Sequence, residues 1–174
     1  RPRPVPHAGA VLPLRPPGPG DEDVARAAQA ALQAEGFDFG LLADGEQWPD
    51  YLARLERDRL GLDLPPGRVP ATFRYADVDR EVVGRASVRH SLSEQLLRIG
   101  GHIGYAVLPA FRRRGYATEI LRQSLVVARA AGVGRALITC DDDNLGSIVV
   151  IERCGGRRDR EWRGDDGVRR YWIA

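Results

Sequence analysis

The strongest constraint on the fold is a long amphipathic helix pattern that lies between two short strand patterns. Over residues 116–131 the small and apolar residues recur at helical spacing, and Gly132 ends the pattern. Apolar runs of strand length precede it at residues 101–108 and follow it at residues 136–140. Because the helix must bury its apolar face, this order predicts an α/β layer arrangement. The residues on that face are Ala117, Ile120, Leu121, Ser124, Leu125, Ala128 and Ala131.

The first half of the chain contains two helix patterns and a hairpin. Acidic residues open an alanine-rich helix pattern over residues 21–36, and Trp48-Pro49-Asp50 opens a second one that ends near Gly61. The period then changes, and residues 72–88 are typical of a hairpin that turns at residues 77–80.

The remaining patterns complete a mixed sheet. We expect a helical turn over residues 93–98, a helix over residues 144–153, and two final strands about residues 164–167. A length of 174 residues suits one domain, which we predict to span residues 1–174. Its proline-rich residues 1–10 should be loose, followed by at most one edge strand.

Composition excludes several classes of protein. All 26 basic residues are arginine, but 24 acidic residues leave a net charge of only +2, so we expect no nucleic-acid partner. No apolar run approaches the ~20 residues of a membrane span, and none near the N-terminus has the length of a signal peptide. We therefore expect a cytoplasmic protein without a membrane partner. Cys140 and Cys154 lack zinc-site spacings, so we expect reduced thiols and no metal.

The turn before the long helix carries the clearest functional signal. Three arginines, Arg112, Arg113 and Arg114, precede Gly115 where the helix begins. A helix start offers free backbone N–H groups and a positive dipole end, and small residues let an anion approach the backbone. These features predict a diphosphate site. The alternative is that Gly115 only turns the chain and the arginines form a solvated patch.

The same residues resemble a known family. Arg112-Arg113-Arg114-Gly115-Tyr116-Ala117 resembles the Q/R-x-x-G-x-G/A element of the GNAT superfamily of acetyl-coenzyme A (acetyl-CoA) dependent N-acetyltransferases. Val107-x-Pro109 resembles the end of that family's fourth strand. The second motif, N-x-x-A/S-x-x-x-Y-E-K-x-G-F, is matched by Asn144, Ser147, Glu152 and Gly155. The resemblance covers residues 101–156, in the family's order and spacing. The segment GGHIGYAVLPAFRRRGYAT and the final RRYWI further resemble a bacterial branch of predicted acetyltransferases.

The resemblance implies a fold and a cofactor site. The fold would be α/β (α+β), with a mixed, mostly antiparallel central sheet of six to seven strands and helices on both faces. A bulge in the fourth strand would separate it from the fifth, and the pantetheine arm of acetyl-CoA would lie in that gap. The turn would hold the diphosphate, and a backbone N–H near Val107 would polarise the thioester carbonyl. The residues assigned to the cofactor are Tyr105, Ala106, Val107, Arg112, Arg113, Arg114, Gly115, Tyr116, Ala117, Thr118 and Asn144.

Proton transfer is less clearly indicated. Many family members use a tyrosine of the second motif as acid, but the matching residue here is Ile151, so the thiolate would leave unaided or with help from Ser147 or water. His102 is the best candidate base, because it precedes the cofactor segment and titrates near neutrality. The alternative is a histidine that is hydrogen-bonded within the sheet. Asn144 could equally be a plain helix N-cap.

The expected acceptor is a primary amine of a small molecule or peptide, which would attack acetyl-CoA directly. Acidic residues at Asp141-Asp142-Asp143 and in the loop of residues 37–51 would suit a cationic amine. Alternatively, the aspartates are solvated, and the loop connects two helices with Trp48 as a core residue. Arg89 and His90 are further candidate contacts or exposed charges at a strand end. The acidic residues of the loop are Asp38, Asp44, Glu46 and Asp50.

Two other functions stay open at this point. A non-catalytic acyl-CoA-binding regulatory module would explain why Ile151 replaces the tyrosine. Nucleic-acid binding through residues 112–114 and 157–163 is weakened by the acids among those arginines. The sequence leaves open whether the chain is a monomer or a homodimer.

Overall fold

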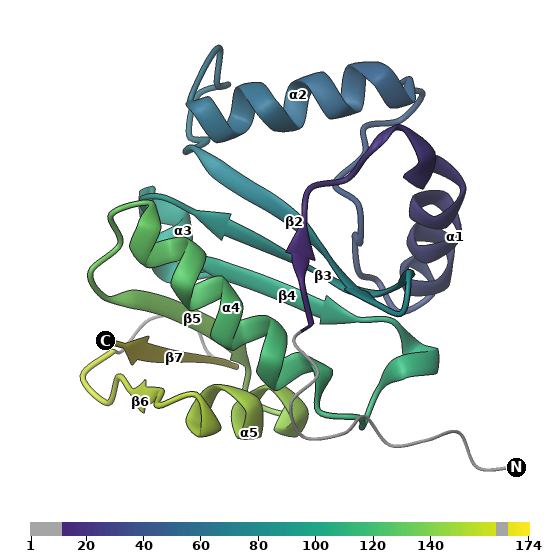
Figure 1. Ribbon diagram of the computed structural model, residues 1–174. Coiled ribbons are helices and arrows are strands. Elements are labelled where there is room, and N and C mark those ends of the chain that lie inside the picture. Colours follow the sequence, from purple (N-terminus) through teal and green to yellow (C-terminus); the bar gives the residue numbers. More distant parts are fainter. Residues whose placement is uncertain (1–11, 163–166) are drawn as a thin grey trace, which may run out of the picture.

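The structure is a computed structural model that describes residues 12–162 and 167–174. The expected loose end at residues 1–10 and most of the turn at residues 164–167 lie outside the described residues. Within them, the helices and strands fall where the sequence patterns predict them (Figure 1). The strands are β1 (Leu14–Arg15), β2 (Ala71–Val78), β3 (Glu81–Arg89), β4 (Ile103–Val107), β5 (Ala136–Asp141), β6 (Arg157–Arg158) and β7 (Val168–Ile173). The helices are α1 (Glu22–Gln33), α2 (Trp48–Leu60), α3 (Glu94–Arg98), α4 (Tyr116–Ala130) and α5 (Leu145–Arg153).

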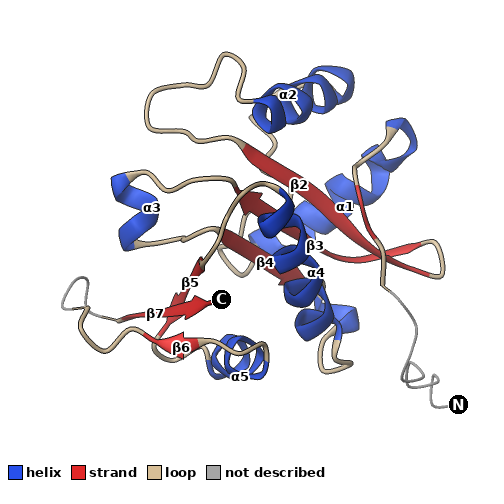
Figure 2. Cartoon of the chain, turned by 60° about the vertical axis from the view of Figure 1, so that its left-hand side comes forward, coloured by secondary structure: helices blue, strands red, loops and turns tan. Residues whose placement is uncertain are grey.

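The strands form two sheets, and the expected single sheet of six to seven strands is wrong. The first sheet has the order β1-β2-β3-β4 and the second the order β5-β7-β6, with antiparallel pairs throughout both (Figure 2). The His102 N–H, just before β4, donates to the Leu137 carbonyl of β5 over 2.7 Å. No ladder continues from this bond within the described residues. The two strands start together and then separate.

Helices cover both faces of the first sheet, as expected. Side chains of α1 and α2 pack with Phe73 and Tyr75 of β2 on one face. On the other face Ile120 of α4 packs with Ala76 of β2 and Ala86 of β3. These side chains point to the opposite face from Phe73 and Tyr75, because successive residues of a strand alternate between the two faces. The result is a layered arrangement with α4 between the first sheet and α5 (Figure 1).

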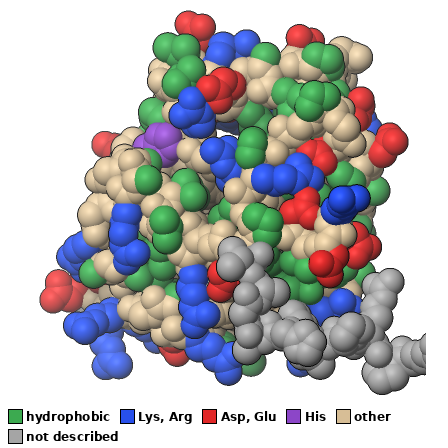
Figure 3. All heavy atoms as spheres, in the orientation of Figure 1, with side chains coloured by type: hydrophobic (Ala, Val, Ile, Leu, Met, Phe, Trp, Pro, Cys, Tyr) green, Lys and Arg blue, Asp and Glu red, His purple; other side chains and the backbone are tan. Residues whose placement is uncertain are grey.

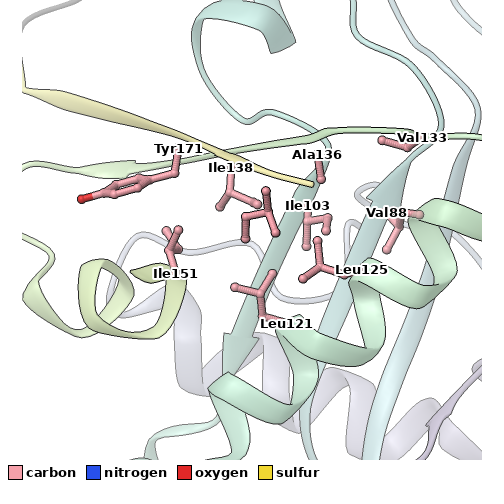
Figure 4. Packing of buried hydrophobic residues seen from close by; sticks show 11 residues of the cluster. Val88, Ile103, Leu121, Leu125, Val133, Ala136, Ile138, Ile151 and Tyr171 are labelled. Atoms are coloured by element: carbon pink, nitrogen blue, oxygen red, sulfur yellow. The ribbon is translucent and has the colours of Figure 1, made fainter. Parts of the chain in front are cut away.

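A second core joins α4, α5 and the second sheet. Its fully buried side chains include Leu121 of α4, Ile138 of β5 and Ile151 of α5 (Figure 4). Tyr171 of β7 lies beside Ile151 in the same cluster. Burying side chains of this size contributes about 1.5–3 kcal/mol each. This core holds the first turns of α4 and α5 beside the gap between the sheets.

Gly101 fixes the point where β4 and β5 meet. Its φ is +59°, and a Cβ atom at this position would collide with the Leu137 carbonyl oxygen. That oxygen is backbone and cannot rotate away. Any side chain here would therefore push the two sheets apart at the bond that joins them.

We expect Gly101→Ala to lower the free energy of unfolding more than Gly132→Ala does. Both glycines have positive φ, so both alanines pay roughly 1–2 kcal/mol for left-handed backbone. Only Gly101→Ala adds the collision, worth about 1–3 kcal/mol as overpacking, because no atom lies within 4 Å of a Cβ at Gly132. Urea unfolding of both variants measures the difference. Equal losses would show that the β4–β5 junction tolerates a side chain.

Candidate functional site

A cleft of about 790 Å³ opens where β4 and β5 separate. The strand ends Val107 and Asp141 and the first turns of α4 and α5 line it, and Phe37 closes it from the segment after α1. Because both strands begin at the His102–Leu137 bond and end at the cleft, they run in the same direction. The predicted site residues that the cleft brings together are Tyr105, Ala106, Val107, Arg112, Arg113, Gly115, Tyr116, Ala117, Thr118, Asn144 and Ser147.

The start of α4 offers unpaired N–H groups to this cleft. Gly115 precedes the helix with φ +84°, and no side chain caps the end. The first bond back along the helix is from the Glu119 N–H to the Gly115 carbonyl, at 3.3 Å. Among the described residues, the N–H groups of residues 116–118 therefore have no acceptor, and they lie at the positive end of the helix dipole. The arrangement is that of an anion site.

The three arginines before the helix diverge. Arg112 donates two hydrogen bonds to the Glu35 carboxylate, at 2.6 and 3.1 Å, and its Nε donates to the Val107 carbonyl. Arg113 lines the cleft. Arg114 instead donates to the Ala110 carbonyl at 2.9 Å and lies over the Phe111 ring, so the structure does not bring it to the cleft.

The edge of β4 presents backbone groups to the cleft. The Leu108 N–H donates to the Val83 carbonyl at 2.9 Å, which makes Gly84–Val107 a non-hydrogen-bonded pair of the antiparallel ladder. The N–H and C=O groups of Val107 consequently point away from β3. Those of Tyr105, two residues earlier on the strand, point the same way. The β3–β4 register is continuous from Ile103 to Val107, so the bulge expected in this strand is not seen there.

The Tyr105 hydroxyl is buried without a hydrogen-bond partner among the residues that the structure describes. Burial raises the pKa of Tyr105 to about 12, an effect that the neighbouring Ser147 side chain partly opposes. The phenol therefore keeps its proton at neutral pH. It is a hydrogen-bond donor held beside the cleft, next to the Ser147 side chain.

The start of α5 serves both interpretations of Asn144. Its Oδ1 accepts a hydrogen bond from the Ser147 N–H at 3.0 Å, which makes it an N-cap, and it also lines the cleft. Ile151 is fully buried in the core, whereas Val150 faces the cleft. The residue matching the family tyrosine thus points toward Tyr171 (Figure 4).

His102 occupies a structural position between the sheets. It is 7% exposed, and its Nδ1 accepts a hydrogen bond from the Leu137 N–H at 2.9 Å. Burial, and secondarily the charge of Arg89, lowers the pKa of His102. The neutral ring then carries its proton on Nε2, while the lone pair of Nδ1 accepts the Leu137 N–H. Neither nitrogen is therefore free to accept a proton from a substrate. This geometry favours the hydrogen-bonded histidine over the base, and His102 does not line the cleft.

Three of the seven acids expected to attract a cationic amine, Asp38, Glu46 and Asp142, already have partners. Asp142 pairs with Arg158 and Arg169, while Asp141 lines the cleft. In the loop of residues 37–51, Glu46 pairs with Arg54 at 2.7 Å. The Asp38 carboxylate accepts a hydrogen bond from the Leu41 N–H, and Asp44 and Asp50 are exposed.

Trp48 is a core residue, as the alternative interpretation of that loop holds. It is 4% exposed, stacks on Tyr51, and donates from its indole nitrogen to the Gly18 carbonyl at 3.1 Å. His90 lies beside Thr72, with 2.8 Å between Nε2 and Oγ1. Both cysteines are free thiols, as expected.

The cleft includes residues that the sequence analysis did not select. Gly146, Val150 and Arg153 share the cleft-facing side of α5 with Ser147. Helical spacing from Ser147 could have found these three. Glu35 and Phe37 reach the cleft only through the packing of α1 on the sheet, for which the sequence carries no signal.

Metal clusters and membrane-spanning helices are not found in the described part of the chain. Over residues 12–162 and 167–174 no group of three or more His, Cys, Asp or Glu side chains could hold a metal ion. In the same ranges no helix combines the length and the apolar character needed to cross a bilayer. On the face shown in Figure 3, basic side chains are scattered among acidic and apolar ones.

Comparisons with known proteins agree with this geometry. The family model described as acetyltransferase (GNAT) domain matches residues 12–157, and the chain therefore belongs to the GNAT acetyltransferase family. No curated protein matches the sequence.

Solved structures share the fold at low sequence identity. An acetyltransferase from Agrobacterium tumefaciens is 18% identical, with a TM-score of 0.63, over 94% of this chain and 90% of that one. RimJ from Mycobacterium smegmatis, in complex with CoA-disulfide, is 19% identical, with a TM-score of 0.66, over 92% and 80%. The putative acetyltransferase yncA from Salmonella typhimurium, with acetyl-CoA, is 16% identical, with a TM-score of 0.60, over 94% and 93%.

The position of His102 predicts a pH dependence of stability. Its pKa is lowered in the folded state, so the unfolded chain binds the proton more readily. The contribution of neutral His102 to the free energy of unfolding is complete above the unfolded-state pKa of about 6.5, and it is lost as the pH falls below that value. We expect the decline in unfolding free energy between pH 7 and 5 to be shallower in His102→Gln, as measured by urea unfolding.

His90→Gln is the control, because the pKa of His90 is also lowered by burial. Its effect should add to that of His102→Gln rather than replace it. A His102→Gln variant with the same pH slope as the parent would mean that His102 titrates alike in both states.

Proposed function

We propose that the protein is an acetyl-CoA-dependent N-acetyltransferase that acetylates a primary amine of a small molecule or peptide by direct attack. The observation that carries the proposal is the cleft between β4 and β5, where N–H groups of α4 that have no acceptor among the described residues meet the outward edge of β4. Family membership and the bound ligands of the RimJ and yncA structures support the same conclusion.

The residues of the cleft fit acetyl-CoA, which when bound would supply an activated acetyl thioester. The N–H groups of residues 116–118 would bind the diphosphate, with Arg113 raising the local potential. The outward N–H and C=O groups of Tyr105 would pair with the amide groups of the pantetheine arm, while the Val107 C=O accepts from Arg112 Nε. A ligand in this position would satisfy backbone groups that β5 leaves without a partner.

Two hydrogen-bond donors would assist the transfer. The Val107 N–H would donate to the carbonyl oxygen that gains negative charge when the amine attacks. The Tyr105 hydroxyl would donate to the sulfur that leaves, in place of the tyrosine that Ile151 replaces. Ser147, which lines the cleft beside it, is the alternative donor. Because His102 has no free nitrogen, the amine proton would leave through water in the cleft.

Acetyl-CoA should stabilise the parent against heat, whereas Gly115→Glu should not respond. A ligand at 100 times its dissociation constant adds about 2.7 kcal/mol of stability. Gly115→Glu places bulk and negative charge where the diphosphate must approach the backbone. Thermal melts with and without acetyl-CoA measure the response.

Gly132→Glu is the matched control. Gly132 also has positive φ, and no atom lies within 4 Å of the position that a Cβ would take there, but it lies at the other end of α4. This variant should respond like the parent. Melts of the parent unchanged by acetyl-CoA, together with no acetylation across a panel of amines, would refute the proposal; binding without turnover would instead indicate an acyl-CoA-binding module.

Tyr105→Phe should lower kcat by about 10- to 100-fold, the worth of one hydrogen bond to a charged group. Binding of acetyl-CoA and stability should hardly change, because the lost hydroxyl has no partner in the described part of the protein. Steady-state kinetics and thermal melts separate the two effects. Ser147→Ala is the comparison, and a larger loss of kcat there than in Tyr105→Phe would make Ser147 the donor.

A further inference from the structure

Two arginines of β3 converge beside the cleft. Arg85 and Arg89 are four residues apart and share the face of the sheet that α1 and α2 cover. Both reach over Gly104 of β4. A Cβ atom at Gly104 would lie 3.6 Å from Arg85 Nη1 and 3.7 Å from Arg89 Nη1 and Nη2. Two guanidinium groups thus lie within reach of one point, next to the β4 segment that lines the cleft.

Neither arginine has a carboxylate partner within residues 12–162 and 167–174. Arg85 is 5% exposed and, among the described residues, donates only to the carbonyls of Gly104 and Asp38, at 3.3 and 3.0 Å. Its Nε has no partner in that part of the chain. Arg89 donates from Nη1 to the carbonyls of Gly100 and Gly101, both at 3.1 Å.

The surroundings leave this charge uncompensated. Burial, and then the charge of Arg89, lowers the pKa of Arg85 to about 10, while the Asp38 carboxylate acts in the opposite direction from a distance. Burial also lowers the pKa of Arg89. Carbonyl groups satisfy N–H donors but do not neutralise a cation, and a buried unpaired charge is unfavourable. An anion would find both guanidinium groups already desolvated and held in place.

A cavity beside Arg89 could receive that anion. It has a volume of about 240 Å³ and lies between β3 and α2. Its charged lining residues are three arginines, Arg54, Arg68 and Arg89, and one aspartate, Asp58, which is paired with Arg54 and Arg68. Because Arg54 also pairs with Glu46, Arg89 is the lining cation that has no carboxylate partner within the described residues, and this charge favours an anion.

Arg85 lies between the cavity and the cleft, although it lines neither space. Its guanidinium lies 4.8 Å from the ring centre of Phe37, which lines the cleft, and 5.8 Å from that of Phe73, which lines the cavity. A molecule that enters the cleft beside Ala106 therefore has this charged group between it and the cavity.

We infer that the amine acceptor carries a carboxylate, which binds to Arg89 and Arg85 while the amine lies at the cleft. The inference rests on the proposed acetyltransferase function. Gly104 and Ala106 are two residues apart on β4, a span of roughly 7 Å. The acceptor is then an ω-amino acid or a short peptide with its amine and carboxylate separated by about that distance. This differs from the cationic acceptor that the loop acids suggest.

The kinetic test compares acceptors that differ only in charge. ω-Amino acids from β-alanine to 6-aminohexanoate are paired with their neutral amides. We expect the parent to prefer the acid of at least one pair by about 10- to 100-fold in kcat/KM, from charge-assisted hydrogen bonds. Arg89→Gln should abolish the preference by raising KM for the acid far more than KM for the amide. Arg122→Gln, which removes an exposed charge from α4, should keep it.

A binding test separates this inference from the proposed function. In the presence of CoA, the preferred acid should raise the melting temperature of the parent but not of folded Arg89→Gln, and its amide should raise neither. Stabilisation by acetyl-CoA together with equal responses to acid and amide would overturn the carboxylate site alone. A response to the acid that survives in Arg89→Gln would do the same. Failure of acetyl-CoA to bind would count against the proposed function, even where the acid still stabilised the parent.

Discussion

The functional geometry depends on a pair of hydrogen bonds between His102 and Leu137. The His102 N–H donates to the Leu137 carbonyl, and the Leu137 N–H donates to the His102 ring. Together they satisfy both backbone groups of Leu137 at the point where β4 and β5 meet. Because the ring takes the place of a backbone acceptor, the ladder stops there and the strands separate. The cleft exists because the first sheet ends at β4.

The elements themselves could be predicted from local patterns, but the pairing between them could not. The apolar face of α4 follows from helical spacing, and its buried residues are those on the predicted face, apart from Ala117 and Ala131 near its ends. The short apolar runs of β4 and β5 indicate strands without saying whether they pair. The role of His102 depends on Leu137, a residue far away in the sequence. The single sheet was a natural expectation that only tertiary contacts could correct, and the same contacts favour a structural His102 over a catalytic one.

The same limit applies to charge. The sequence shows acids in the loop of residues 37–51, and these suggest a cationic acceptor. In the fold Glu46 is engaged by Arg54, whereas Arg85 and Arg89 lie within the structure without carboxylate partners in its described part. A net charge of +2 for the chain gives no sign of this. What matters for recognition is which charges remain unpaired after folding, and this depends on contacts between segments distant in sequence.

Two of the buried polar atoms that lack partners within the described residues lie against β4, on opposite faces of the sheet. The Tyr105 hydroxyl lies on the face covered by α4, and Arg85 Nε lies on the face covered by α1 and α2. An unsatisfied buried polar group costs about 1–3 kcal/mol, and apolar side chains of similar size would avoid that cost. Departures from a locally optimal core are expected at functional sites, where a ligand supplies the missing partner. Since the two atoms flank the segment that would bind acetyl-CoA and its acceptor, one strand would serve both substrates, one from each face.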